Sequence, residues 1–234
     1  MSSPHNLADY KTSFIQTCLS VQALRFGTFT LKSGRQSPYF FNAGLFHRND
    51  LARSMAKAYA QTLASSDVQF DVLFGPAYKG ITLAALAADK LLDVDEKKYG
   101  GLVSYSYNRK EAKTHGEGGS IVGSPLKGKR VVIVDDVITA GTAIREAIAI
   151  IKAEGGVLAG IIVAFNRLEK APAKEGESED APRQSAIGEV RKQHGIPVLS
   201  ILSLDDVVGF LKQGGSEGDL KRLEAYRQKY KACD

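Results

Sequence analysis

The chain has 234 residues, and its 44% hydrophobic and 24% charged content is ordinary for a globular protein with a sizeable core. A formal net charge of +5 comes from 31 basic and 26 acidic residues without any long basic block. The charge therefore does not require a nucleic-acid partner, and we predict none, whereas anionic small molecules fit it as ligands. No apolar run approaches the roughly 18 residues of a membrane span, so we predict no membrane partner.

The cysteines and the N-terminal segment bear on the compartment. Cys18 and Cys233 stand at opposite ends of the chain without metal-type spacing, which favours two free thiols over a disulfide. Pro4, Asp9 and Lys11 fall where a signal peptide needs apolar residues. The sequence therefore predicts a protein of the cytoplasm, where thiols stay reduced.

The N-terminal region predicts a helix followed by a β-hairpin. Apolar residues from Leu7 to Leu19 recur at helical spacing, and Asn6 can cap this helix. Aromatic and β-branched residues then flank the turn KSGRQS, which is typical of a hairpin, with Pro38 near an edge. We expect the helix and the hairpin to form a small separate layer, the hood.

The middle of the chain alternates strand-like and helix-like segments. After a helix over residues 51–63, the strand candidates are DVLFG, GLVSYSY, RVVIVDD and VLAGIIVAF. Helical runs such as GITLAALAADKLL and GTAIREAIAIIKAEGG separate them. This alternation predicts an α/β fold with a mostly parallel central sheet and helices on both faces.

Residues 168–184, LEKAPAKEGESEDAPRQ, combine prolines with dense charge and have little to bury. We predict a flexible surface insertion there rather than an interdomain linker. Another helix, the strand IPVLSIL and two closing helices follow. We therefore expect one domain, with the hood at about residues 1–65 plus the C-terminal helices, and the core at about residues 66–212.

Two adjacent aspartates end the strand RVVIVDD. Ligands of open parallel sheets bind beyond the carboxyl ends of the strands, which is where Asp135 and Asp136 fall. The turn TAGTA that follows offers backbone N–H groups and hydroxyls at a helix N-terminus, which suit a phosphate monoester. The carboxylates would repel that phosphate and match hydroxyls or a bridging cation, so the pattern fits a ribose 5-phosphate. The structural alternative is that Thr142 caps the helix and one aspartate pairs with a nearby base.

The stretch GPAYKGIT nearly matches the P-loop pattern G-x-x-x-x-G-K-[ST], but Ile81 stands where the lysine belongs. Nucleoside-triphosphate hydrolysis is thus a rival interpretation, and the displaced Lys79 counts against it. A tight strand-to-helix turn can still direct N–H groups and Lys79 to a diphosphate. The alternative is a plain turn with a solvated lysine.

The stretch NRKEAKTHGEGGS, residues 108–120, carries glycine and positive charge without apolar anchors. Its cationic side chains are Arg109, Lys110, Lys113 and His115. We interpret it as a mobile lid whose closure excludes water and brings cations to a departing diphosphate. The alternative is a solvated charged loop, on which a lone histidine is more often a surface residue.

Residues of the hairpin and of one strand end suit a planar base. Lys32 lies beside the hairpin turn, and the adjacent Phe40 and Phe41 would face opposite sides of a strand, one toward the core and one toward a planar ring. Arg167 ends the strand VLAGIIVAF on the ligand side, where a guanidinium can hold a carboxylate through two hydrogen bonds. Core packing and a surface ion pair remain equal alternatives.

These motifs resemble a known family. VVIVDDVITAGTA is similar to the phosphoribosyl-diphosphate-binding motif of type I phosphoribosyltransferases. TLKSGRQSPYFFN, GPAYKGI, RKEAKTHGEGG and the strand-end FNR together resemble the orotate phosphoribosyltransferases, in the same order over about residues 7–211. The resemblance implies the type I phosphoribosyltransferase fold, and residues 168–184 fall outside its motifs.

The resemblance also implies a reaction. A pentosyltransferase of this kind moves the ribose 5-phosphate of 5-phospho-α-D-ribose 1-diphosphate to N1 of orotate, giving orotidine 5′-monophosphate and diphosphate in pyrimidine (UMP) biosynthesis. The implied cofactor is Mg²⁺, held mainly by the substrate diphosphate, ribose hydroxyls and water rather than by a protein cage. A homodimer whose lid closes over the neighbouring subunit's site is implied too, as is a non-proline cis bond between Ala77 and Tyr78.

By resemblance, each matching position receives an expected role. Lys113, His115 and Asp136 would be catalytic. The positions expected at the phosphoribosyl donor are Lys32, Tyr78, Lys79, Arg109, Lys110, Lys113, His115, Asp135, Asp136, Val137, Ile138, Thr139, Ala140, Gly141, Thr142 and Ala143. Those expected at orotate are Lys32, Phe40, Phe41, Thr139 and Arg167.

Two other functions remain open at this point. A purine-specific phosphoribosyltransferase is the nearest enzymatic rival, and Arg167 with the FF pair argues against it. A non-catalytic regulator that senses the phosphoribosyl donor is the second, and it would need no lid.

Overall fold

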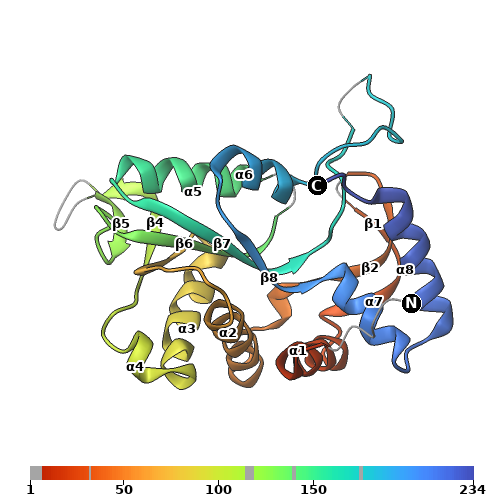
Figure 1. Cartoon of the computed structure of the whole chain (residues 1–234), viewed down its shortest axis with the longest axis horizontal. Coiled ribbons are helices and arrows are strands. Elements are labelled where there is room, and N and C mark those ends of the chain that lie inside the picture. The colour runs from red at the N-terminus through yellow and green to blue at the C-terminus, as the bar shows by residue number, and fades with distance from the viewer. Residues whose placement is uncertain (1–6, 32, 114–118, 139–140, 174–175) are drawn as a thin grey trace.

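A six-stranded sheet forms the centre of the molecule (Figure 1). The computed structural model describes residues 7–31, 33–113, 119–138, 141–173 and 176–234, with the backbone alone at 112 and 113. The strand order is β5-β4-β3-β6-β7-β8, in which β5 is antiparallel to β4 and the other neighbours are parallel. The strands are β3 (Val72–Gly75), β4 (Ser104–Lys113), β5 (Gly119–Gly123), β6 (Arg130–Val137), β7 (Val157–Asn166) and β8 (Val198–Ser203). The predicted mostly parallel α/β sheet is confirmed.

Helices cover both faces of this sheet (Figure 1). One face carries α1 (Asp9–Ser20), α2 (Asn49–Ala64), α3 (Lys79–Val94) and the short α4 (Glu96–Tyr99), and the other carries α5 (Thr142–Ala153) and α6 (Ala186–His194). Val132 and Val134 of β6 join the first core, whereas Val131 and Ile133 join the second, because successive strand residues point to opposite faces. Among the described residues, no helix has the length and apolar content needed to cross a membrane.

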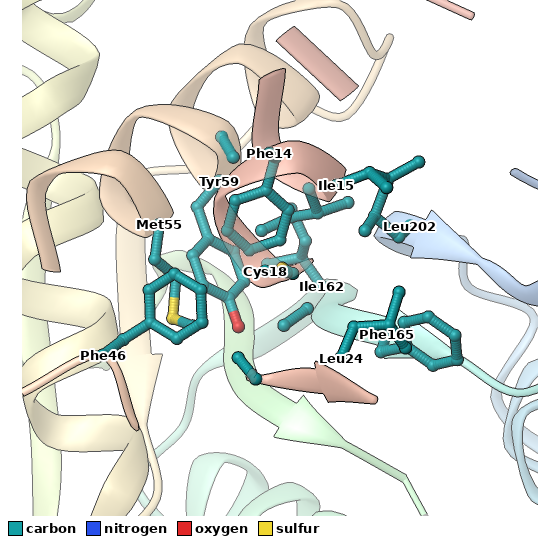
Figure 2. Packing of buried hydrophobic residues seen from close by; sticks show 14 of the residues in the cluster. Phe14, Ile15, Cys18, Leu24, Phe46, Met55, Tyr59, Ile162, Phe165 and Leu202 are labelled. Carbon is teal, nitrogen blue, oxygen red and sulfur yellow. The ribbon is translucent and has the colours of Figure 1, made fainter. Parts of the chain in front are cut away.

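The hairpin predicted for the hood is present beside β8, but α1 packs on the central sheet rather than in a separate layer. Strands β1 (Leu24–Thr30) and β2 (Gln36–Phe41) form the expected antiparallel hairpin, the 3₁₀ helix η1 (Ala43–Leu45) follows, and α7 (Leu204–Lys212) and α8 (Glu217–Tyr230) close the chain against it (Figure 1). The predicted cap Asn6 lies outside the described residues. Phe14, Ile15 and Cys18 of α1 pack with Tyr59 and Phe165, so hood and sheet share one core (Figure 2).

The segment expected to be a lid loop is in part a β-hairpin. Strand β4 continues to Lys113 and β5 begins at Gly119, while residues 114–118 lie outside the described residues. The expectation of a loop is wrong for residues 108–113, because Asn108 pairs with Ile121 and Lys113 with Gly119 in an antiparallel ladder. Backbone pairing needs no apolar side chains, so their absence from the sequence concealed the strand.

The described residues of the charged segment 168–184 make specific contacts with the hood. Lys170 N–H donates to Tyr230 O at 2.8 Å. The Arg35 guanidinium donates to the carbonyls of Lys170 and Ala171 at 2.7 and 3.2 Å. These partners come from distant parts of the chain, which is why composition alone predicted only a surface insertion.

Candidate active site

The centre of the sheet is a topological switch point. Strands β3 and β6 are neighbours in the sheet. The strand that follows β3 in the chain, β4, lies on one side of this pair, and the strand that follows β6, β7, lies on the other side. A ligand crevice is expected outside the carboxyl ends of strands at such a point. Both strand ends lead into helix N-termini, α3 at Lys79 and α5 at Thr142. The tertiary fold therefore brings the predicted diphosphate turn beside the aspartate motif.

The two aspartates are held by their own turn and by one lysine. Asp135 Oδ1 accepts from Asp136 N–H at 2.8 Å, and Asp136 Oδ1 accepts from Val137 N–H at 2.9 Å. Lys79 Nζ lies 2.9 Å from Asp136 Oδ2. The hydroxyl of Tyr59, on α2, donates to the Asp135 carbonyl at 2.7 Å. Sequence reasoning did not identify Tyr59, which supports the strand end from the facing helix.

Burial and charge raise the pKa of Asp135 and that of the neighbouring Tyr59. Burial raises the pKa of Asp135 to about 6, and the negative charge of Asp136 adds to the rise. The pKa of Tyr59 lies well above its usual range, first because of burial and then because of the two carboxylates. A cation or hydroxyl donors at this position would stabilise the ionised carboxylates.

The turn after β3 is closely packed. A Cβ atom on Gly75 would lie 2.0 Å from Gly80 O, so glycine allows α3 to begin directly against the strand end. The Ala77–Tyr78 bond is cis, as the resemblance implied. Ala77 N–H donates to the side-chain oxygen of buried Asn108 at 3.0 Å, which joins this turn to the base of the lid hairpin. Asn108 was missed as a supporting residue because no pattern in the sequence links it to Ala77.

The turn after β6 leads into α5 through a glycine in the left-handed backbone region. Gly141 has φ +72° and is the N-cap of α5, and exposed Thr142 is the first helical residue. The alternative in which Thr142 caps the helix is therefore wrong, although the lysine–aspartate pair that it included is present. Val137 and Ile138 pack against the two cores, and the Val137 N–H is already bonded to Asp136 Oδ1. Exposed Ala143 follows Thr142 in the first turn, and Thr139 and Ala140 lie outside the described residues.

The two phenylalanines of β2 separate as predicted. Phe41 packs against the main core and stacks on Phe165, with ring centroids 5.2 Å apart. Phe40 instead lies 5.6 Å from Phe29, with the Arg25 guanidinium 5.8 Å from its centroid. Phe40 is thus the aromatic ring outside the core. Lys32 lies outside the described residues.

Arg167 follows the last residue of β7 and is partly buried. Its Nε donates to Glu169 Oε1 at 2.9 Å and to the Tyr39 hydroxyl at 3.3 Å. Its Nη2 is buried and lies 2.9 Å from the same carboxylate, but no acceptor lies in a hydrogen-bonding direction. An ion pair is therefore present, as the alternative predicted, but it is partly buried rather than at the surface.

The lid residues are only partly described. Arg109 is half-buried, and its Nε finds no acceptor, while Lys110 is exposed. Of Lys113 the backbone alone is described, and His115 lies outside the described residues. Within the described ranges, no group of three or more histidine, cysteine or acidic side chains could hold a metal ion.

A cavity of about 430 Å³ lies beside the lysine–aspartate pair, between η1, α2 and α3. Lys79 and Asp136 line one part of it, and Met55, Tyr59 and Leu83 belong to its walls. Tyr78, which precedes α3, is 74% exposed. A larger depression of about 750 Å³ involves Ala159 and Leu199, near the amino-terminal ends of β7 and β8, and contains none of the predicted site residues. Of the two, the smaller cavity is the one that predicted site residues line, namely Lys79 and Asp136.

The site combines a switch point in the sheet, paired aspartates at one strand end and a helix N-terminus beyond them, which is the arrangement of a phosphoribosyltransferase. The phosphoribosyl transferase domain matches residues 45–186. The orotate phosphoribosyltransferases of Neurospora crassa and Schizosaccharomyces pombe are 53% and 50% identical to this chain, covering 97% and 95% of it and 99% of each relative. The solved orotate phosphoribosyltransferase of Francisella tularensis matches with a TM-score of 0.80 and 38% identity, over 94% of this chain and 100% of that one. The chain belongs to the orotate phosphoribosyltransferase family.

Proposed function

We propose that this chain transfers the ribose 5-phosphate of 5-phospho-α-D-ribose 1-diphosphate to N1 of orotate, in pyrimidine (UMP) biosynthesis. The bond from ribose C1 to the diphosphate breaks, the bond from C1 to N1 forms, and the N1 proton is released. Beyond family membership, one observation carries this proposal: Asp135, Asp136 and Lys79 meet at the switch point beside two helix N-termini. Such a site matches a sugar that bears a phosphate at one end and a diphosphate at the other.

The donor would be held by complementary groups along its length. Asp135 and Asp136 would accept hydrogen bonds from the ribose hydroxyls, and the backbone N–H groups that lead into α5 would bind the 5-phosphate. Lys79 and the turn of Ala77 and Tyr78 would face the diphosphate. Breaking the C1–O bond gathers negative charge on the leaving group, so these donors and the lid cations would stabilise the transition state more than the ground state.

The acidic pair also fits a divalent cation of limited protein ligation. Mg²⁺ prefers oxygen ligands and commonly binds through one or two carboxylates, water and substrate phosphates. Asp135 and Asp136 are two such carboxylates, and the described residues add no third acidic, histidine or cysteine ligand. When bound, Mg²⁺ would neutralise part of the diphosphate charge. The two aspartates would hold it through water or the ribose hydroxyls.

Arg167 and Phe40 suit orotate better than a purine. Orotate carries a carboxylate on a planar ring, and the buried Nη2 of Arg167 is a donor without an acceptor. Phe40 has a ring outside the core that could stack on the base. A purine has no carboxylate to satisfy Arg167, which disfavours the purine-specific alternative. We also assign Lys32 and Thr139 to the proposed base site, on the family resemblance alone.

We further propose a homodimer in which Arg109, Lys110, Lys113 and His115 reach the neighbouring subunit's site. The β4–β5 hairpin gives these cations a stem, and the bond from Ala77 to Asn108 joins the base of that stem to a diphosphate turn. Lys113, His115 and Asp136 would then act at the reacting centre. The described cysteines, buried Cys18 and exposed Cys233, are both free thiols, which supports the cytoplasm as the proposed compartment.

An absorbance assay of orotate consumption tests the function. Orotate should disappear only when the phosphoribosyl donor and Mg²⁺ are both present, and hypoxanthine, adenine and uracil should not compete. Consumption of a purine in place of orotate would support the purine-specific alternative. Donor binding without consumption of any base would support the regulator.

A further inference from the structure

A partly buried carboxylate, Glu169, lies between its neighbour Arg167 and Arg35 from a distant part of the chain. Its side chain is 12% exposed, and its Oε2 lies 3.7 Å from Arg35 Nη1. Its Oε1 accepts from Arg167 Nε at 2.9 Å and from the Tyr39 hydroxyl at 3.1 Å. A carboxylate so enclosed keeps its place only where charged and hydroxyl donors surround it.

Arg35 fixes the segment that carries Glu169. The Arg35 side chain is only 5% exposed, and its guanidinium lies 4.7 Å from the Tyr230 ring centroid. Its Nη1 and Nη2 donate to the carbonyls of Lys170 and Ala171, the two residues that follow Glu169, and its Nε donates to Glu179 at 2.7 Å. The planar donor group of Arg35 therefore ties the hairpin of the hood to the chain just beyond Arg167.

The backbone between Arg167 and Glu169 has an unusual conformation. Leu168 has φ +54°, which is uncommon for a residue with a bulky side chain. Its N–H donates to the Asn166 side chain at 3.0 Å, and the leucine side chain packs against the main core. Strained backbone of this kind persists where its surroundings hold it and is found often at functional sites. Here it accompanies a turn that lets Glu169 meet the side of the Arg167 guanidinium.

We propose that Glu169 is a positioning residue that aims Arg167 at the carboxylate of the base. The inference rests on the proposed function and deepens it. Glu169 takes the Nε side of the guanidinium, with Oε1 2.9 Å from both Nε and Nη2, and the hydrogen bond that it accepts comes from Nε. A guanidinium held along one side offers its remaining donors in a fixed direction, and fixed donors bind a carboxylate at a lower entropic cost.

The opposite role for Glu169 would be to weaken substrate binding by neutralising Arg167. Two conservative substitutions separate these roles. Glu169→Asp keeps the charge but withdraws the carboxylate by one methylene, and Glu169→Gln keeps the length and an acceptor oxygen but removes the charge. If Glu169 positions Arg167, the aspartate variant loses more affinity for the carboxylated ligand than the glutamine variant does. If Glu169 neutralises Arg167, the affinity for the carboxylated ligand changes most in the glutamine variant, and that variant binds the ligand more tightly.

The experiment compares the dissociation constants of orotidine 5′-monophosphate and uridine 5′-monophosphate, which differ by the base carboxylate. We expect Glu169→Asp to weaken binding of the carboxylated nucleotide about five- to tenfold and binding of the other less than about twofold. Glu169→Gln should retain most of the affinity for both. An unchanged aspartate variant, an equal loss for both nucleotides, or tighter binding by the glutamine variant would each overturn the proposal.

Glu179→Asp is the matched control, because Glu179 is also bonded to Arg35 but has no described contact with Arg167. It should leave the ratio of the two dissociation constants unchanged. If it reproduces the effect of Glu169→Asp, the network is merely structural and the proposal fails. A wild-type chain that shows no preference for the carboxylated nucleotide yet consumes orotate would overturn this inference alone. Failure of the orotate assay itself would overturn the proposed function.

Discussion

Lys79 Nζ lies 2.9 Å from Asp136 Oδ2, so the lysine that we assign to the diphosphate is paired with an aspartate that we assign to the ribose hydroxyls. The Lys79 side chain is 69% exposed, whereas that of Asp136 is 11% exposed. An ion pair with one solvated partner contributes little to stability, and its lysine can exchange the aspartate for a more highly charged anion. The pair can thus hold Lys79 close to the position where a diphosphate would arrive.

Lys79→Gln should lower kcat/KM for the donor about 10²- to 10³-fold, because it removes a cation from the leaving group. The free energy of unfolding should change by less than about 1 kcal/mol. Lys90→Gln is the control, since Lys90 pairs with Asp89 and Asp93 near the other end of the same helix. Steady-state kinetics and urea unfolding of both variants check this, and equal kinetic losses would contradict the assignment.

The pKa of Asp135 should make stability depend on pH. The folded pKa of about 6 is above the ordinary value of 3.8, so the folded chain holds this proton more tightly than the unfolded chain does. The stabilisation from protonated Asp135 is fully present below pH 3.8 and is lost as pH rises through about 6. Relative to Asp135→Asn, the wild-type chain should lose up to about 3 kcal/mol of unfolding free energy across this window.

Urea unfolding of wild type and Asp135→Asn between about pH 3.5 and pH 7.5 measures this difference. Titrating groups that do not interact with Asp135 are common to both chains and cancel in the comparison. A difference that stays constant with pH would mean that Asp135 titrates normally.

Gly75→Ala should displace the diphosphate turn. The new Cβ would lie 2.0 Å from Gly80 O, and this backbone contact cannot be relieved by a side-chain rotation. We expect a loss of about 1 to 3 kcal/mol in unfolding free energy and a raised KM for the donor. Gly218→Ala is the control, because Gly218 lies in α8 with its nearest neighbour 3.8 Å from an added Cβ. That variant should be neutral or slightly stabilised, since alanine favours a helix.

Arg167→Ala should raise the KM for orotate at least about tenfold, because a charge-assisted pair with the base carboxylate is lost. The KM for the donor should change much less. Initial rates over a matrix of both substrate concentrations separate the two constants. Similar increases in both would show that Arg167 supports the site without contacting the base.

Lys113→Ala should lower turnover about 10²- to 10³-fold with a smaller effect on donor binding, since the leaving group gains charge as its bond breaks. A shared site makes a sharper prediction. Chains with Lys113→Ala, mixed and exchanged with chains carrying Asp136→Asn, should form heterodimers in which one site has both wild-type residues. Activity should then rise above that of either parent. Heterodimers that are demonstrably present and inactive would place the lid on its own subunit's site or outside the reaction.

Local patterns in the sequence were sufficient for the strands of the parallel sheet and for the place of the two aspartates at a strand end. The run VVIV predicted a strand buried on both faces, and its end placed Asp135 and Asp136 at the ligand edge. The glycines at 75 and 80 marked the tight turn before α3, and the hairpin followed from the residues around KSGRQS. These features depend on neighbours within a few positions, where side-chain periodicity and turn chemistry act directly.

Contacts between distant residues were decided only by the tertiary structure. The antiparallel pairing of β4 with β5 satisfies backbone groups, which leave no mark in the pattern of side chains. The bond from Ala77 to Asn108 and the enclosure of Glu169 by Arg35 and Arg167 join segments that the sequence presents separately. A sequence does not distinguish a charged residue that is solvated by water from one that pairs with a buried partner. The free energy of these ion pairs depends on distance and burial, and both exist only once the chain has folded.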